Sequence, residues 1–367
     1  MAVYLDANAS EPPRPQALEA ALRALALTGN PASVHGPGRA ARAQLDSARE
    51  TLARLLDARP GDVVFTSGAT EANALALHAL PAGRTVLVGA TEHDSVLAAA
   101  PSATRLAVDR DGVIDLDAAA AALARGPAFV AVMAANNETG TIQPLPALAA
   151  LCRRHGAWLH VDAVQGLGRG PVPPCDSLAI SGHKLGGPPG AGALVLRGPT
   201  GAPRPLLAGG GQEGGWRAGT PPLAAIAGLA AAAEAAFAAG PAEMARLAKL
   251  RDAVIAAAEA AGAVALATGA PRLVNTACLA LPGVRADAQV IALDLAGIAV
   301  SAGAACSSGK VAPSHVLAAM GLGRLAGEAI RVSLPWNATE ADARAFADAY
   351  PAIAARLRAA SLAPAAA

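Results

Sequence analysis

The sequence predicts an α/β fold, with a mostly parallel central sheet in a large domain and a smaller α+β domain after it. Three observations support this prediction. From about residue 60, short β-branched runs alternate with helical stretches. These runs are continuously apolar, which is typical of strands that helices cover on both faces. Beyond residue 240 the alternation gives way to a long Ala-rich helix and a few strand-like pieces.

The expected strands of the large sheet are residues 63–66, 85–88, 129–133, 158–161 and 178–180. A helical Ala/Leu stretch follows the first strand and reaches Leu80. We expect the large domain to cover residues 15–240. The small domain is expected at residues 241–367, together with residues 1–14.

The second part of the chain is predicted from a change of pattern around residue 240. An Ala-rich helix over residues 223–239 breaks at Gly240-Pro241, because proline disrupts a helix interior. A second Ala-rich helix reaches about Ala261. Strand-like pieces follow at residues 275–281 and 298–301, with further helices before an Ala-rich tail.

Composition excludes several classes of function. The chain carries 29 basic and 28 acidic side chains, and 2% of its residues are aromatic, so it lacks the basic surface and stacking platforms of nucleic-acid binders. Its longest stretch without Asp, Glu, Lys or Arg, residues 218–233, is shorter than the ~18 apolar residues of a membrane span. No secretory leader is visible, and the four cysteines form no CxxC pair. We expect a cytoplasmic protein with separate thiols, no metal site, and no nucleic-acid or membrane partner.

Polar residues gather where the expected strands end. In parallel sheets, ligands bind beyond the carboxyl ends of the strands. The segments at those ends are residues 67–70, 92–93, 136–138, 162–165 and 181–184. We expect the functional site among them.

Lys184 and Asp162 are the most informative of these residues. Lys184 lies in a Ser-Gly-His-Lys turn, where it could form a Schiff base with a carbonyl cofactor; alternatively it caps carbonyls or reaches water. Asp162 ends an apolar run, so its carboxylate must be paired or solvated. It could hold the protonated ring nitrogen of pyridoxal phosphate, or it could cap a following helix. Gln165 could donate to the phenolic oxygen of that ring.

A phosphate site is predicted at residues 67–70, Ser-Gly-Ala-Thr, which end one strand and open a helix. Backbone N–H groups and hydroxyls at such a turn bind anions, although Ser67 or Thr70 could simply cap the helix. Ser181, His183 and Thr220 would complete the phosphate cup.

Two further strand-end residues have both a functional and a structural interpretation. His93 could stack over a cofactor ring and move protons, because its pKa lies near neutrality; otherwise it is a loop histidine. Asn137 could fix an oxygen of the cofactor or the substrate; otherwise it is a turn residue.

Cys306 is the one cysteine with reactive surroundings. Gly, Ala and Ser residues flank it over residues 301–310, which predicts a mobile loop and an accessible thiol. A few per cent of an ordinary thiol is thiolate at neutral pH, enough for nucleophilic attack. Cys152, Cys175 and Cys278 fit the alternative role of buried, inert thiols.

Taken together in order, these motifs resemble the NifS/IscS-like cysteine desulfurases of the class V aminotransferase superfamily, which use pyridoxal 5′-phosphate. The resemblance covers nearly the whole chain. It is carried by residues 4–6, 29–33, 65–71, 91–93, 136–140, 160–165, 181–184, 217–220, 301–310 and 330–334. It implies fold type I of the pyridoxal-phosphate enzymes.

The resemblance also implies roles toward the cofactor. Lys184 would carry it and move the α-proton of the substrate, while Asp162 would hold the pyridine nitrogen. His93 would stack on the ring and take part in catalysis. The remaining cofactor contacts would be Gln165 and Asn137 at the ring oxygen, and Ala69, Thr70, Ser181, His183 and, from the other subunit of a homodimer, Thr220 at the phosphate.

Toward L-cysteine, the resemblance implies that Arg331 clamps the carboxylate with the help of Asn137. Cys306 would attack the substrate sulfur, leaving L-alanine and an enzyme persulfide for a sulfur acceptor, of iron–sulfur scaffold or tRNA-thiolation type. The alternatives are a class V aminotransferase or a selenocysteine/cysteine β-lyase, in which Cys306 is a spectator. A sulfur carrier without catalytic activity is a third, which Lys184 and Asp162 argue against.

Overall fold

The computed structural model describes residues 2–81, 83–303 and 313–362. Its larger sheet has seven strands in the order β2-β8-β7-β6-β5-β3-β4. The strands are β2 (Val63–Thr66), β3 (Thr85–Gly89), β4 (Thr104–Leu106), β5 (Ala128–Met133), β6 (Trp158–Asp162), β7 (Ser177–Ser181) and β8 (Gly192–Leu196). Only β8 runs against its neighbours, pairing antiparallel with β2 and β7. The predicted mostly parallel sheet is therefore confirmed.

Helices cover both faces of this sheet, as the apolar runs predicted. Alternate side chains of β5 point to opposite faces: Val130 and Val132 join one buried apolar cluster, whereas Phe129 and Ala131 join another. The first cluster includes α2 and α6, and the second includes α3. Because both faces are dry, every residue of β5 is buried, and the strand lacks the alternation of a half-exposed one.

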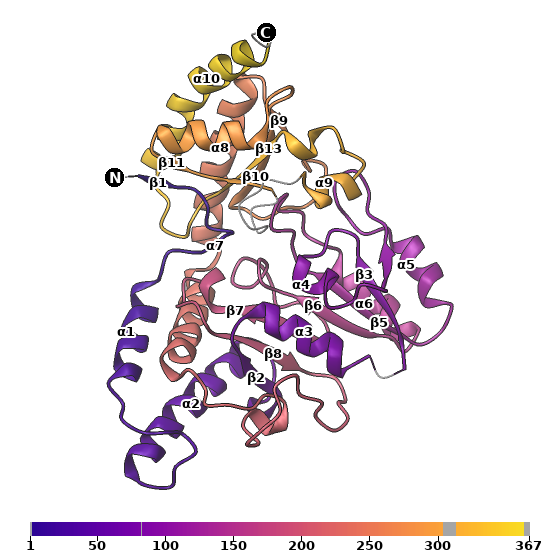
Figure 1. Ribbon diagram of the computed structural model, residues 1–367, viewed down its shortest axis with the longest axis vertical. Coiled ribbons are helices and arrows are strands. Elements are labelled where there is room, and N and C mark those ends of the chain that lie inside the picture. Colours follow the sequence, from indigo (N-terminus) through magenta and orange to yellow (C-terminus); the bar gives the residue numbers. More distant parts are fainter. Residues whose placement is uncertain (1, 82, 304–312, 363–367) are drawn as a thin grey trace, which may run out of the picture.

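The helices complete the architecture seen in Figure 1. They are α1 (Pro15–Leu25), α2 (Gly36–Leu55), α3 (Ala69–Ala79), α4 (Asp94–Leu97), α5 (Leu116–Leu123), α6 (Leu145–Arg154), α7 (Leu223–Ala260), α8 (Ala286–Leu295), α9 (His315–Ala319) and α10 (Glu340–Leu362). Short 3-10 turns are η1 (Pro60–Asp62), η2 (Gly182–Lys184), η3 (Glu213–Gly215) and η4 (Leu325–Gly327).

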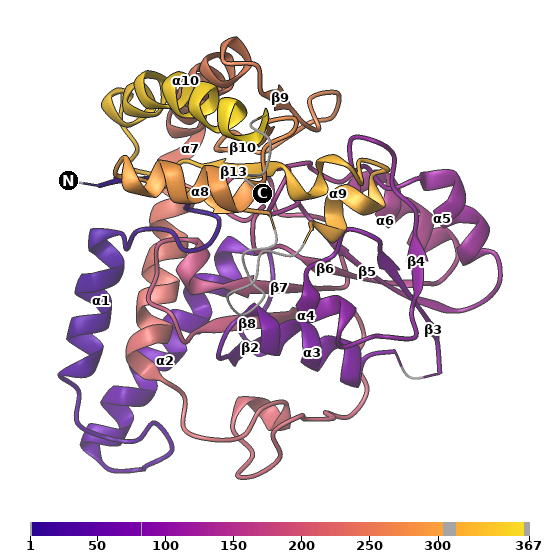
Figure 2. The same cartoon turned by 45° about the horizontal axis from the view of Figure 1, so that its top comes forward.

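A second, smaller unit lies above the large sheet in Figures 1 and 2. Its antiparallel sheet has the order β12-β13-β10-β9. The strands are β9 (Val264–Ala265), β10 (Thr276–Ala280), β12 (Ser301–Ala302) and β13 (Ala329–Ser333), with a separate parallel pair of β1 (Val3–Tyr4) and β11 (Ile298–Ala299). Its apolar core takes residues from the second half of α7 and from α8 and α10. The predicted α+β companion to the large sheet is thus present.

Helix α7 joins the two cores. Gly240 has φ 62° and ψ −162° inside it, so the helix is two segments that meet where the sequence predicted a break. Residues before Gly240 pack in the core of the large sheet, and residues after it pack in the second core. By length and composition alone α7 could cross a membrane, but this packing on both sides of the break is that of a core helix. The boundary at residue 240 itself stays a prediction, and we propose it on these grounds.

Candidate active site

A cavity of about 630 Å³ lies at the carboxyl ends of the parallel strands, and the second sheet closes it with Ser301 and Arg331. Ten of the residues predicted from the sequence line this one cavity. They are Ala69, Thr70, His93, Asn137, Asp162, Gln165, Ser181, His183, Lys184 and Arg331. These residues lie up to 262 positions apart in the sequence, from Ala69 to Arg331. The fold brings them together at the strand ends, where parallel sheets bind ligands.

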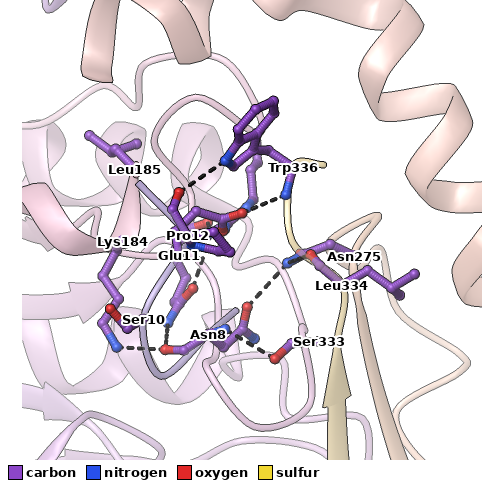
Figure 3. A network of polar contacts seen from close by, with 12 residues as sticks. Asn8, Ser10, Glu11, Pro12, Lys184, Leu185, Asn275, Ser333, Leu334 and Trp336 are labelled. Carbon is purple, nitrogen blue, oxygen red and sulfur yellow. Dashed lines mark hydrogen bonds and ion pairs between the residues drawn. The ribbon is translucent and has the colours of Figure 1, made fainter. Parts of the chain in front are cut away.

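Lys184 is partly buried and lines the cavity. It ends the turn η2 directly after β7, and its Nζ donates to the main-chain oxygens of Asn8 (2.5 Å) and Ala9 (2.9 Å). Figure 3 shows Nζ pointing at the N-terminal segment that carries Asn8. Lys184 therefore caps main-chain carbonyls, which was the alternative to a functional role, and it also lines the cavity. Its amine is within reach of a cofactor there.

Asp162, the last residue of β6, is paired within the protein. Its side chain is 6% exposed, and Oδ2 accepts a hydrogen bond of 2.7 Å from Nδ2 of Asn73. Oδ1 accepts from the backbone N–H of Val164 at 3.0 Å. The residues after Asp162 form a turn rather than a helix, so the helix-cap alternative is wrong. Each carboxylate oxygen keeps a lone pair for a further donor in the cavity.

Gln165 lies in this turn and its amide is oriented by two neighbours. Nε2 donates to the main-chain oxygen of Asn8 at 3.0 Å, and Oε1 accepts from Arg169 at 3.2 Å. Arg169 in turn pairs with the buried carboxylate of Glu11 at 2.5 Å. Burial raises the pKa of Glu11, although Arg169 opposes that shift. The ion pair therefore anchors the Gln165 amide beside the cavity.

The turn between β2 and α3 has the features of an anion site. The N-cap of α3 is Gly68, which has no side chain to cap the helix, so neither Ser67 nor Thr70 is the cap. Ala69 and Thr70 face the cavity with Ser181. A helix N-terminus that ends in a polar cavity favours an anion, because its first N–H groups point outward and carry partial positive charge.

Gly192 permits the close approach that forms this turn. A Cβ at Gly192 would lie 2.5 Å from the carbonyl oxygen of Ile180 and 2.6 Å from Cα of Gly68. Only glycine at this start of β8 lets the backbone of Gly68 rest against the sheet. The position of the anion site therefore depends on a residue that does not line it.

Two histidines, His93 and His183, line the cavity. Nδ1 of His93 accepts from the backbone N–H of Ser95 at 3.1 Å and lies 2.9 Å from its hydroxyl, so His93 both caps α4 and faces the cavity. Burial, with the charge of Lys184, lowers the pKa of His183 to about 4. His183 is thus a neutral ring at pH 7, able to donate a hydrogen bond to an anion.

Arg331, on β13, brings the one guanidinium that lines the cavity in the described part of the chain. It is 4% exposed and donates to Asp6 Oδ1 (2.6 Å) and to the main-chain oxygen of Asn137 (3.2 Å). Its Nε is buried and meets no hydrogen-bond acceptor among the described residues. A buried donor without a partner is costly, so this atom favours a carboxylate ligand. Asn137 itself sits in the predicted turn and lines the cavity too.

The remaining two predicted residues are Thr220 and Cys306. Thr220 is exposed and does not line the cavity within one chain. Cys306 lies outside the described residues. Burial raises the pKa of Cys152, Cys175 and Cys278 to about 12 each. At pH 7 a thiol of that pKa is about one part in 10⁵ thiolate, which agrees with the prediction that these three are inert.

The donor set fits pyridoxal phosphate. An amine, a carboxylate and an anion-binding turn surround one cavity. They match, in that order, the carbonyl, the ring nitrogen and the phosphate of the cofactor. Among the described residues, no side chain caps the N-terminus of α3 and no acceptor meets Nε of Arg331, so both groups favour an anion. Among the residues the structure describes, no cluster of three His, Cys, Asp or Glu side chains suits a metal ion.

Sequence reasoning missed two asparagines. Asn8 is 1% exposed and its main-chain oxygen receives both Lys184 and Gln165. Asn73 is fully buried on α3 and holds Asp162. Asn8 follows the motif at residues 4–6, and Asn73 lies one helical turn beyond the phosphate-site residues. In the sequence, the only local sign of a role for either residue is a polar amide between two alanines.

Comparison with known proteins identifies the family. Residues 3–346 match the aminotransferase class-V family. A cysteine desulfurase of Cereibacter sphaeroides is 42% identical over 98% of this chain and 97% of that protein, and an IscS-like cysteine desulfurase of Mycobacterium tuberculosis is 37% identical over 99% and 98%. A solved NifS-like protein from Rickettsia africae superposes with a TM-score of 0.89 at 30% identity, covering 96% of this chain and 99% of that one. SspA, solved in complex with cysteine, superposes with a TM-score of 0.78 at 28% identity, covering 90% and 98%.

This chain therefore belongs to the aminotransferase class-V family, whose members use pyridoxal phosphate. The predicted resemblance to NifS/IscS-like cysteine desulfurases and the predicted fold type I are confirmed.

Proposed function

We propose that this protein is a pyridoxal-phosphate-dependent cysteine desulfurase. It converts L-cysteine and the Cys306 thiol into L-alanine and a Cys306 persulfide. One observation carries the proposal: Lys184, Asp162 and Arg331 line a single cavity together with the open N-terminus of α3. The names of the relatives favour a desulfurase over the aminotransferase and β-lyase alternatives.

The cofactor would be held at five points. Lys184 would bind its carbonyl carbon through Nζ, and the Asp162 carboxylate would accept a hydrogen bond from its protonated ring nitrogen. The turn at Ala69 and Thr70 takes its phosphate with Ser181 and His183; His93 lies against its ring, and Gln165 and Asn137 contact its ring oxygen. When bound, the cofactor supplies an electron sink for bonds at the substrate's Cα.

The chain's own residues then position L-cysteine and move its protons. Arg331 receives the substrate carboxylate, since its Nε is aimed at no acceptor within the described structure. Lys184 takes the proton from Cα and can return it, as a general base and acid. The Cys306 thiolate forms an S–S bond with the substrate's Sγ while the Cβ–Sγ bond breaks, and Cβ gains a proton to give alanine.

We also propose a homodimer. Leu22 and Leu25 on α1 and Val34 after it are 66%, 69% and 88% exposed, an apolar surface of the kind that a second copy covers. Thr220 is exposed as well, so it is available to the partner's cavity. Mixed dimers of Lys184→Ala and Thr220→Ala chains test this. If Thr220 acts across the interface, one site per mixed dimer is intact and activity returns; no recovery would place Thr220 in its own chain's site.

We further propose that the protein is cytoplasmic and passes persulfide sulfur to an acceptor of the iron–sulfur scaffold or tRNA-thiolation type. The three described cysteines are free, which agrees with a reducing compartment. Loading the protein with ³⁵S-cysteine and adding each acceptor type separately would reveal which one takes up the label. Labelled sulfur that reaches only small thiols would argue against a protein acceptor.

The function is tested with Cys306→Ala and the matched control Cys175→Ala. Cys306→Ala should purify yellow and cofactor-loaded, yet release no sulfide from L-cysteine, because the cofactor contacts lie elsewhere. Cys175→Ala should keep its activity, since burial leaves that thiol inert. Undiminished sulfide release by Cys306→Ala would reject the thiol's role and support the β-lyase alternative.

A further inference from the structure

Asn73 uses its whole amide in hydrogen bonds without lining the cavity. It is 0% exposed on α3. Nδ2 donates to Asp162 Oδ2 at 2.7 Å and to Ser95 Oγ at 3.0 Å, and Oδ1 lies 3.0 Å from Nε2 of His160. The amide therefore joins three polar groups, Asp162 and His160 of β6 and Ser95 of α4, and two of them, Asp162 and Ser95, line the cavity.

The direction of these bonds is fixed from deep in the core. Trp158 Nε1 can only donate, so Ser177 Oγ accepts from it at 2.9 Å. Apart from Trp158 and His160, Ser177 Oγ meets no hydrogen-bond partner among the described residues, so its hydroxyl gives its proton to His160 Nδ1, also at 2.9 Å. Burial lowers the pKa of His160 to about 3, so its ring is neutral and its one proton sits on Nε2. That proton points at Asn73 and identifies the facing atom as Oδ1.

The other end of the Asn73 side-chain amide is therefore the NH₂ group, which donates two hydrogen bonds. One N–H of Asn73 meets Asp162, and the other meets Ser95 Oγ. Because Ser95 Oγ accepts from Asn73, its own hydroxyl proton is available to His93 Nδ1, 2.9 Å away. The backbone N–H of Ser95 donates to the same Nδ1. Nδ1 of His93 is thus an acceptor, and the proton of the neutral ring is on Nε2.

We propose that Asn73 is a positioning residue that sets, through one amide, both the orientation of the Asp162 carboxylate and the orientation of the Ser95 hydroxyl, which faces His93 Nδ1. The inference rests on the proposed function, in which Asp162 and His93 contact the cofactor. Asn73 touches neither cofactor nor substrate. It relays the fixed polarity of the Trp158–Ser177–His160 chain to two residues of the cavity.

The first test uses the wild-type chain without cofactor. Two-bond ¹H–¹⁵N spectra of the imidazole rings report which nitrogen carries the proton. We expect the Nε2–H tautomer for both His160 and His93. An Nδ1–H tautomer at either residue overturns the proposal, and this result does not depend on any variant folding or on cofactor binding.

The second test uses Asn73→Ala and Asn73→Asp, with Gln289→Ala as a matched control. Gln289 is also 0% exposed and also makes three hydrogen bonds, to Val284, Glu328 and Tyr350, away from the cavity. Removing a buried charge-assisted bond should weaken pyridoxal-phosphate binding to the apo protein about tenfold or more in Asn73→Ala. A carboxylate facing Asp162 should weaken it further in Asn73→Asp.

The ¹⁵N chemical shift of His93 Nδ1 should change in Asn73→Ala, because the Ser95 hydroxyl loses the donor that orients it, and should keep its wild-type value in Gln289→Ala. Unchanged cofactor affinity, or an unchanged chemical shift of His93 Nδ1, in a folded Asn73→Ala protein overturns the proposal. Failure of the wild-type protein to bind pyridoxal phosphate would instead overturn the proposed function, so the two failures are distinguishable.

Discussion

The Nζ of Lys184 donates to the main-chain oxygen of Asn8, while the side chain of Asn8 reaches the second sheet (Figure 3). Nδ2 of Asn8 donates to Thr276 Oγ1 at 2.9 Å and to the main-chain oxygen of Asn137 at 3.1 Å. Oδ1 accepts from Asn275 at 3.2 Å. The place of the lysine, which follows a strand of the large sheet, is thus set by a segment anchored to the other sheet.

Replacing Asn8 with alanine should therefore destabilise the whole chain. The substitution leaves buried partners of its amide unsatisfied, which costs about 2–4 kcal/mol in unfolding free energy. Urea denaturation measures the loss. Asn337→Ala, at an exposed position, should stay within about 0.5 kcal/mol of wild type. Equal losses in the two variants would contradict the anchoring role of Asn8.

Gly192→Ala should impair the anion site from outside. Its Cβ would contact the backbone of Ile180 and Gly68 at 2.5–2.6 Å, so the turn must move. Overpacking of this kind costs about 1–3 kcal/mol, and pyridoxal-phosphate affinity, followed by fluorescence titration, should fall with it. Gly201→Ala, where an added Cβ meets nothing within 4 Å, is the control. Wild-type affinity in Gly192→Ala would show that the close approach is unimportant.

Arg331→Lys should raise KM for L-cysteine more than it lowers kcat. An ammonium cannot reproduce the two-pronged grip of a guanidinium on a carboxylate, so kcat/KM should fall about 10–100-fold. Arg324→Lys, on the surface, should leave both constants unchanged. A fall in kcat with KM unaltered would mean that Arg331 does not bind the substrate carboxylate.

His160 should make stability depend on pH. Burial lowers its pKa from 6.5 to about 3, so the unfolded chain binds one more proton between these values. Its contribution is therefore complete above about pH 6.5 and is lost as the pH falls, by roughly 1.4 kcal/mol per pH unit. In His160→Gln the unfolding free energy should fall less steeply from pH 7 to pH 4.5 than in wild type. The exposed His155→Gln should keep the wild-type slope, and parallel curves for His160→Gln would contradict the assignment.

Much of the fold was predictable because the strands of the large sheet are buried on both faces. Runs such as residues 129–133 are apolar throughout and end close to where β5 ends. β8 was missed, since Gly192 and Ala193 at its start continue a Gly/Pro-rich segment. Its place between β2 and β7 depends on tertiary pairing rather than local pattern.

The site was predictable where chemistry and position coincide. Lys184 and Asp162 are charged residues at the ends of apolar runs, where a charge is unusual. The sequence alone therefore pointed to a role for each. It pointed to none for Asn8 and Asn73, because an amide in an Ala-rich stretch is also an ordinary turn or helix residue. Their importance comes from partners distant in the sequence, such as Thr276 for Asn8 and Asp162 for Asn73.

The cavity's assignment as a pyridoxal-phosphate site is tested most directly by reducing the cofactor-loaded protein with borohydride and mapping the labelled peptide by mass spectrometry. The chain has three lysines, Lys184, Lys249 and Lys310, so the result is unambiguous. Our account predicts the pyridoxyl label on Lys184 alone. A label on Lys249 or Lys310, or no label on a protein that binds the cofactor, would contradict it.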